Sequence, residues 1–488
     1  MHISNVGWLV VAVALLLPAP ARAQAPVPEE TTSVTQHSVR IGGQTINYTA
    51  TAGTYVLREE GKPTASIFYV AYTRDGVADR RRRPLVISFK GGPGSSSVWM
   101  HMGFTGPRRV GYDEQGFMLR PPFRLEDNEH AIIDVADIVY IDPAATGYSR
   151  MVEGQDAHKY HGVMEDIQSV AEFVRMYVTR TSRWDSPKFL IGESYGTTRA
   201  AGLAGYLQSQ HRMYLNGVIL VSMTGLDVEK GVDVSAATGL PHYTATAWYH
   251  KVLPADLQAK PLRAVLDEAE RWAMTDYLTA LVKGHDLPDA EREAVAKQAA
   301  RYTGLSAEYA LRADLRVDRG RFRKELLRSR GVTVGRLDSR YTGVDRDEAG
   351  ETYEFDPAME SWNGPFTAVV NTYLREELKY ETDLEYNIFG PVQPWRRPPN
   401  VNVGEMLRRA MTQNPFLRVM ILEGYYDGAT DHFGAQYTIS HLDPGGQLKD
   451  RFTFAFYECG HMMYIRKADL AKSKQDLVAF IRAAVPQS

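Results

Sequence analysis

The fold of this chain is indicated most clearly by the stretch Gly192-Glu193-Ser194-Tyr195-Gly196. Residues 188–191 before it form an apolar run typical of a β-strand, and residues 197–207 after it are compatible with a helix. A G-x-S-x-G sequence in this setting is typical of a sharp turn that raises a serine hydroxyl above the edge of a sheet. The glycines keep Cβ atoms away from a turn whose central residue is strained. Ser194 is therefore a candidate nucleophile.

Two later segments supply the partners that a serine nucleophile needs. Asp427 follows the apolar run 417–422 and a glycine turn, and His461 follows the β-rich run 452–457 and a turn of small residues. Taken singly, His461 is explained as well by an ordinary structural histidine, and Asp427 by a turn or a helix cap. The chain order serine, acid, histidine and the shared placement after strands favour a Ser-His-Asp triad.

A glycine-rich loop follows another predicted strand, residues 84–89. It runs Lys90-Gly91-Gly92-Pro93-Gly94-Ser95-Ser96-Ser97. Acyl transfer creates an oxyanion, which needs fixed backbone N–H donors, and we predict those of Gly92 and Tyr195. The alternatives are a phosphate-binding loop, which lacks the Gly-Lys-Ser/Thr of that motif, and an ordinary tight turn.

These motifs resemble those of the serine carboxypeptidases, peptidase family S10 of the α/β-hydrolase class. Residues 192–195 match the family's G-E-S-Y, and residues 91–97 match its G-G-P-G-C-S-S with Ser95 in place of the cysteine. Asp142-Pro143 with Gly147-Tyr148-Ser149 resembles its D-Q-P-x-G-x-G-[FY]-S block, and residues 460–462 match its G-H-M. The resemblance implies an α/β-hydrolase fold with a mostly parallel sheet, and serine carboxypeptidase activity through an acyl-enzyme.

The resemblance also assigns roles. Ser194 is expected to be the nucleophile, His461 the base and Asp427 its orienting acid, while the expected oxyanion donors are Gly92 and Tyr195. No cofactor or metal is implied. No His, Asp or Cys cluster in the sequence has a recognised ligand spacing.

The residues implied for substrate binding depart from the family pattern. The family holds the peptide's C-terminal carboxylate with an Asn before Gly-Gly, a Glu in the following helix and the Glu of G-E-S-Y. In this chain Lys90 stands at the Asn position, Phe104 falls at the helix position, and only Glu193 is retained. The residues expected to bind substrate are Lys90, Gly91, Glu193 and Phe104. The alternative to a carboxypeptidase is therefore an esterase, amidase or acyltransferase with the same triad. A non-catalytic binding protein is a third hypothesis, which the complete triad disfavours.

Composition limits the remaining classes of function. The chain has 488 residues, of which 44% are hydrophobic and 24% charged, enough for a large core. Its net charge of −3 gives no reason to expect nucleic acid binding. The partner expected from the triad is a peptide or small acyl substrate. The only cysteine, Cys459, excludes an intramolecular disulfide, and we interpret it as a small buried hydrophobe.

The N-terminus has the pattern of a secretory signal. Residues 6–17 are almost wholly apolar, and Ala21-Arg22-Ala23 resembles a cleavage site, so we predict a signal peptide over residues 1–23. The apolar run is too short to span a membrane, and we expect no span in the mature protein. This pattern predicts an exported protein. Eukaryotic members of the family that the chain resembles usually carry disulfides, so the resemblance implies a bacterial member, periplasmic or extracellular, for a chain with one cysteine.

The remaining sequence suggests a sheet-forming core with an insertion. Short antiparallel strands are predicted at 45–48, 54–57 and 66–70, and parallel strands at 138–141, 188–191 and 217–221. From residue 227 to 400 the pattern changes to charged helices, including 255–282, 289–302 and 319–328, with a loop at 331–343. We therefore predict a core over 24–226 and 401–488, and a helical cap over 227–400 that covers the site.

Overall fold

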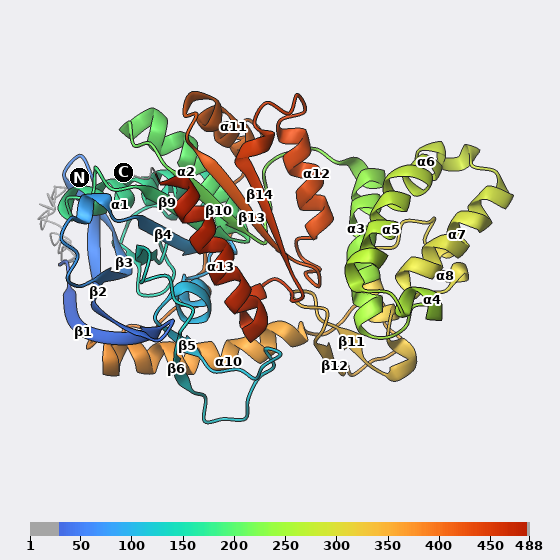
Figure 1. Ribbon diagram of the computed structural model, residues 1–488, viewed down its shortest axis with the longest axis horizontal. Helices are drawn as coiled ribbons and strands as arrows, with labels where there is room; N and C mark the ends of the chain where they lie inside the picture. The colour runs from blue at the N-terminus through green and yellow to red at the C-terminus, as the bar shows by residue number, and fades with distance from the viewer. Residues whose placement is uncertain (1–28, 486–488) are drawn as a thin grey trace, which may run out of the picture.

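The computed structural model describes residues 29–485, so the predicted signal peptide lies outside the described residues. A mixed sheet forms the body of the molecule, and a lobe of helices lies beside it (Figure 1). The order of the main sheet is β1-β2-β3-β7-β4-β9-β10-β13-β14, with β8 paired to β3. The strands are β1 (Thr32–Ile41), β2 (Gln44–Glu59), β3 (Lys62–Arg74), β4 (Leu85–Lys90), β5 (Arg108–Val110), β6 (Leu125–Asp127), β7 (Asp137–Ile141), β8 (Arg150–Met151), β9 (Lys188–Glu193), β10 (Gly217–Val221), β11 (Thr333–Val334), β12 (Thr342–Gly343), β13 (Arg418–Gly424) and β14 (Phe452–Tyr457).

The strands from β7 to β14 in this order are parallel, as the sequence predicts. Strands β4, β7, β9 and β10 are buried along their whole length, because helices cover both faces of the sheet. The helices are α1 (Val163–Arg180), α2 (Tyr195–His211), α3 (Gly231–Tyr249), α4 (Ala255–Gln258), α5 (Leu262–Trp272), α6 (Leu278–Lys283), α7 (Asp289–Thr303), α8 (Ala307–Arg312), α9 (Arg319–Glu325), α10 (Pro357–Thr372), α11 (Val403–Gln413), α12 (His432–Leu442) and α13 (Lys467–Ala484).

Two hydrophobic cores lie on the two faces of this sheet. Helices α1, α2, α11 and α12 contribute to one core, while α10 and α13 contribute to the other. Each parallel strand supplies alternate residues to the two cores, which explains why its sequence is continuously apolar rather than alternating. The loops at the carboxyl ends of these strands are thereby held between two packed layers.

Three predicted elements differ from the structure. The predicted loop at 331–343 is one of them, because β11 and β12 within it pair as a two-stranded sheet. The predicted strands at 45–48 and 54–57 belong to one continuous strand, β2, because Gly53 between them stays paired to Thr32 on β1 and to Tyr69 on β3. The predicted helix at 255–282 is divided into α4, α5 and α6. The first break falls at Pro261, which directly precedes α5 and cannot continue a helix from α4.

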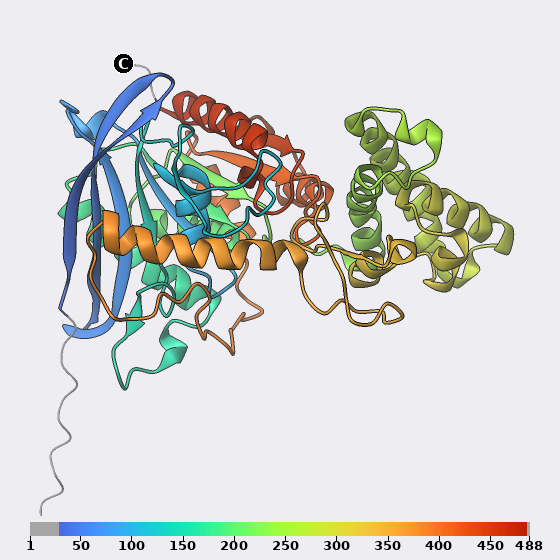
Figure 2. The ribbon, with the colours of Figure 1, turned by 90° about the horizontal axis from the view of Figure 1, so that it is seen from below.

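The chain between β10 and β13 forms two different structures. Helices α3 to α9 make the lobe, whose buried side chains form a hydrophobic cluster of their own. The chain then returns through β11 and β12 to α10, which runs along the sheet body (Figure 2). The side chains of α10 join the core of the body, including Trp362, Phe366 and Val370. Among residues 29–485, no helix is long and apolar enough to cross a membrane.

Candidate active site

The turn at Ser194 joins β9 to α2 at the carboxyl edge of the parallel strands. Ser194 has φ +58° and ψ −129°, a conformation that non-glycine residues rarely adopt. Glycine is required beside it, because a Cβ atom on Gly192 would lie 2.1 Å from the carbonyl oxygen of Gly196. The Ser194 N–H donates to Val221 O at the end of β10, at 3.0 Å. The strained turn is thus fixed to the neighbouring strand.

Asp427 and His461, predicted as acid and base, lie in direct contact. His461 Nδ1 is 2.6 Å from Asp427 Oδ2, and both side chains are buried. Thr430 supports the carboxylate, donating its N–H to Oδ1 at 3.0 Å and its hydroxyl to Oδ2 at 2.6 Å. Burial acts to raise the pKa of Asp427, but His461 and the Thr430 hydrogen bonds outweigh it and hold this pKa below its ordinary value. The carboxylate is therefore charged and holds the imidazole in place.

The end of β10 links the serine turn to the histidine loop. Val221 O accepts from the Ser194 N–H, and the hydroxyl of the next residue, Ser222, donates to His461 O at 2.7 Å. No hydrogen bond joins the Ser194 hydroxyl to His461 within the described residues. In hydrolases without substrate this contact is often long and tightens when substrate binds. The two residues thus share a rigid support.

The glycine loop after β4 packs closely against the serine turn. The Gly91 N–H donates to Glu193 O at 3.0 Å, and a Cβ atom on Gly91 would lie 2.0 Å from the backbone nitrogen of Gly196. Gly91 is therefore used in packing. In the described chain, the N–H groups of Gly92 and Tyr195 have no protein acceptor, so both are available to bind an anionic oxygen.

A buried pair that the sequence analysis missed supports this loop from α2. Arg199 donates to Asp166 from two nitrogens, at 2.8 and 3.0 Å, and to Lys90 O at 2.7 Å. The Tyr195 hydroxyl also donates to Asp166, at 3.0 Å. Arg199 thus fixes the residue from which the glycine loop starts. Its distance of 33 residues from Asp166 leaves no local signal in the sequence.

Three of the residues predicted to bind substrate form a second cluster, at the start of the glycine loop. Lys90 Nζ lies 2.6 Å from Glu193 Oε1, and both side chains are buried. The Tyr464 hydroxyl donates to Glu193 Oε2 at 2.7 Å. Phe104 stacks on the Tyr464 ring, with the ring centroids 4.7 Å apart and the planes at 9°. The structure therefore brings Lys90, Glu193 and Phe104 together through Tyr464, a residue that sequence reasoning missed although it follows the G-H-M motif by two positions.

Among residues 29–485, no three His, Cys, Asp or Glu side chains gather in a way that could hold a metal ion. The charged and polar groups around Ser194 are instead joined in pairs by hydrogen bonds. We assign no metal ligands.

Comparison with known proteins identifies the same class of fold. The sequence model of the serine carboxypeptidase family matches residues 43–305. The structure is similar to Kex1(delta)p, a prohormone-processing carboxypeptidase from Saccharomyces cerevisiae, with a TM-score of 0.54 and 16% identity over 88% of this chain and 91% of that one. A monoglyceride lipase variant from Saccharomyces cerevisiae has a TM-score of 0.38 and 10% identity, over 96% of this chain and 99% of that one. No curated protein matches the sequence. The family match, the likeness to the carboxypeptidase and the parallel sheet order confirm the α/β-hydrolase fold predicted from the sequence.

Proposed function

Because the chain belongs to the serine carboxypeptidase family, we propose that it hydrolyses C-terminal peptide bonds with Ser194, His461 and Asp427 as its triad. The observation that carries this proposal is the buried contact of 2.6 Å between His461 Nδ1 and Asp427 Oδ2, on the loops beside the strained Ser194 turn. In that arrangement the free Nε2 of His461 is the atom that can take the serine proton.

The proposed reaction has two halves. The Ser194 hydroxyl attacks the scissile carbonyl carbon while His461 Nε2 takes its proton, and the N–H groups of Gly92 and Tyr195 bind the oxyanion. His461 then gives the proton to the leaving amine, which departs as the C-terminal amino acid. Water attacks the acyl-enzyme by the reverse sequence of proton transfers, releasing the shortened peptide and the free serine.

We propose that Lys90 receives the carboxylate of the peptide. An ammonium group has three donors, so Lys90 can keep its 2.6 Å contact with Glu193 Oε1 while it also binds a substrate carboxylate. Glu193 then orients Lys90 and is itself held by Tyr464. This exchanges a neutral amide for a charge-assisted donor, since the family's Asn stands where this chain has Lys90.

A second candidate function is an esterase, amidase or acyltransferase that uses the same triad. The contact between Lys90 and Glu193 also favours this view, because the two charges neutralise each other and Phe104 replaces a carboxyl group. Under this view the site has no receptor for a substrate carboxylate, and a free C-terminus is of no advantage.

Matched peptides with free or amidated C-termini, followed by mass spectrometry, separate the two candidates. We expect release of single C-terminal residues from the free acids only. In Lys90→Ala we expect kcat/KM for free-acid peptides to fall about 100-fold or more, the loss of a charge-assisted contact, while simple esters are largely spared. The control is Lys188→Ala. It removes another buried lysine, at the first residue of β9, whereas Lys90 contacts Glu193 at the last residue of that strand. Equal cleavage of amidated peptides would favour the second candidate.

We also propose that the enzyme acts after export, on the evidence of the signal sequence predicted at residues 1–23. Fractionation of cells that express the full chain tests this. We expect the processed protein, starting near Gln24, in the periplasmic or extracellular fraction, and a full-length protein retained in the cytoplasm would contradict it.

A further inference from the structure

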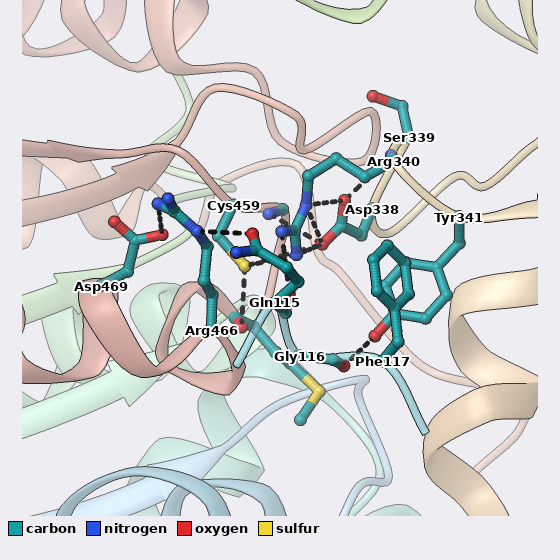
Figure 3. A network of polar contacts seen from close by, with 12 residues as sticks. Gln115, Gly116, Phe117, Asp338, Ser339, Arg340, Tyr341, Cys459, Arg466 and Asp469 are labelled. Carbon is teal, nitrogen blue, oxygen red and sulfur yellow. Dashed lines mark hydrogen bonds and ion pairs between the residues drawn. The ribbon is translucent and has the colours of Figure 1, made fainter. Parts of the chain in front are cut away.

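A short segment of the insertion lies against the loops that carry Asp427 and His461. This segment, Arg336–Tyr341, connects β11 to β12 and is called the strap below (Figure 3). It was predicted from the sequence only as part of a loop over 331–343. It contacts the Asp427 loop through backbone groups, and the His461 loop through the Leu337 carbonyl and the side chains of Asp338 and Arg340.

The strap contacts the loop of the catalytic acid on both sides of Asp427. The Ser339 N–H donates to Tyr426 O, and the Gly428 N–H donates to Arg336 O, each at 2.9 Å. These two bonds hold the residues directly before and after Asp427.

The strap contacts the loop of the catalytic base at His461 itself. The His461 N–H donates to Leu337 O at 2.6 Å, and the Gly460 N–H donates to Asp338 Oδ2 at 3.1 Å. The packing is so close that a Cβ atom on Gly460 would lie 2.4 Å from the Cβ atom of Asp338. The backbone at Gly460 and His461 is therefore bound to the strap through two consecutive N–H groups.

A buried ion pair fixes the strap in this position. Arg340 lies 2.6 Å from Asp338 Oδ2 and donates to Gln115 O at 3.0 Å and to Cys459 Sγ at 2.9 Å. Both charged side chains are almost completely buried, 1% exposed for Asp338 and 2% for Arg340. Figure 3 shows the guanidinium of Arg340 directed at both the Asp338 carboxylate and the Cys459 sulfur. Cys459 lies two residues before His461, so the pair holds this loop at two points.

The strap is also joined to the helical lobe and to the body. Asp356, the N-cap of α10, accepts from the N–H groups of Arg336 and Leu337, each at 3.0 Å. From the lobe, His250 lies 2.7 Å from Ser339 O, and the hydroxyls of Thr246 and Ser339 are 2.7 Å apart. The strap is thus the part of the insertion that touches helix α3, helix α10 and the catalytic loops together.

We propose that Asp338 is a positioning residue for His461, which acts through the Gly460 N–H, and that Arg340 holds the Asp338 carboxylate for this task. The inserted segment then contributes to positioning the catalytic base. The proposal rests on the triad of the proposed function. It explains why a buried ion pair stands at this point, where a pair of apolar side chains would fill the space without directing an acceptor at Gly460.

The test is the double variant Asp338→Leu/Arg340→Met, which removes both charges and leaves neither one buried alone. Replacement of a buried ion pair by apolar side chains is often neutral for stability, so we expect the protein to fold with little change in melting temperature. We expect kcat on a small activated ester to fall about 100-fold, because a displacement of about 1 Å in a catalytic group can cost that much, with KM nearly unchanged. Asp338→Asn keeps an acceptor for the Gly460 N–H, and we expect its kcat to exceed that of the double variant.

The matched control is Asp345→Leu/Lys324→Met, which removes an equally buried pair of the same insertion, 3% exposed on both sides. These residues contact neither catalytic loop, and we expect kcat to stay within about twofold. Unchanged kcat in the folded Asp338→Leu/Arg340→Met protein, or equal losses in the two double variants, would overturn the proposal. Reaction with a fluorophosphonate distinguishes a wrong triad assignment from a wrong positioning role. Failure of wild type to react at Ser194 contradicts the triad, and equal reaction rates of wild type and the strap variant contradict only the positioning role.

Discussion

The two parts of the segment between β10 and β13 differ in what they pack against. The first part, helices α3 to α9, buries its apolar side chains mainly against one another, around Phe322 and Tyr243. The second part, residues 331–400, adds Leu337, Tyr341 and Trp362 to the core of the sheet body. One part of the insertion has its own core, and the other is built into the catalytic half of the molecule.

This difference indicates which part of an insertion serves the chemistry. The lobe has a core of its own and so can vary with less effect on the body, although Ala245, Leu262 and Leu266 also pack on Tyr425 and Tyr426. The strap has no such freedom, since its backbone is bonded to residues next to Asp427 and to His461 itself. We infer that changes in the lobe alter stability and substrate access, whereas changes at the strap alter kcat.

The largest contrast is expected between two glycine substitutions. In Gly460→Ala the new Cβ atom would lie 2.5 Å from Leu337 O, so the strap or the His461 loop has to move, and we expect kcat to fall about 100-fold. In Gly304→Ala, within the lobe, the residue has φ +72° and its Cβ atom would lie 2.9 Å from Val252. We expect a lower melting temperature but kcat within about twofold of wild type, since the strain is confined to the lobe. Steady-state kinetics and thermal denaturation measure both, and equal kcat in the two variants would remove the distinction.

A smaller contrast is expected between two aromatic truncations. Phe322→Ala leaves a cavity in the core of the lobe, and Trp362→Ala, on α10, leaves one in the core of the sheet body. Each substitution is expected to lower the free energy of unfolding by about 3–5 kcal/mol. The Trp362 indole N–H also donates to the Tyr341 hydroxyl at 3.2 Å, at the end of the strap. We therefore expect a several-fold loss of kcat in Trp362→Ala and none in Phe322→Ala. The measurement is kcat at a temperature where denaturation curves show both proteins folded, and the reverse ranking would count against this account.

The smallest effects concern pH, where Asp142 in the sheet body and Asp345 in the insertion are expected to respond in opposite directions. Burial raises the pKa of Asp142, beside the glycine loop, to about 6. Burial also acts to raise the pKa of Asp345, in the insertion, but hydrogen bonds from Lys324 and Thr333 outweigh it and lower this pKa. The folded protein therefore binds the Asp142 proton more tightly than the unfolded chain does, and the Asp345 proton less tightly.

The signs follow from these shifts. The Asp142 contribution is full below pH of about 4 and is lost as the pH rises to about 6, a cost of about 3 kcal/mol at about 1.4 kcal/mol per pKa unit. The Asp345 contribution is present above about pH 4 and is lost as the pH falls below it. At pH 7 we expect Asp142→Asn to raise the free energy of unfolding and Asp345→Asn to lower it. Urea denaturation between pH 4 and 7 measures both, and the same sign in both variants would be inconsistent with these shifts.

Local sequence was sufficient for the features that depend on neighbouring residues. The Ser194 turn needs glycines at fixed positions, and the buried strands need continuous apolar runs. The contact between Asp427 and His461 could be anticipated because both follow strands that meet at one edge of a parallel sheet.

The features that the sequence did not reveal depend on residues far apart in the chain. Arg340 and Cys459 meet across 119 positions, and Tyr464 and Glu193 across 271. The strap was not predicted because its hydrogen bonds to the catalytic loops use mostly backbone groups, which every residue type has. Helix α3 was not predicted as such because its second half is buried on all sides and has no amphipathic pattern.

The most direct test of the central claim, that Ser194 is the nucleophile of a Ser-His-Asp triad, is the mapping of a fluorophosphonate adduct by mass spectrometry. We predict one adduct per wild-type chain, on Ser194, and none on folded Ser194→Ala protein, whose kcat should be lower by several orders of magnitude. An adduct on another serine, or full activity of Ser194→Ala, would contradict the account.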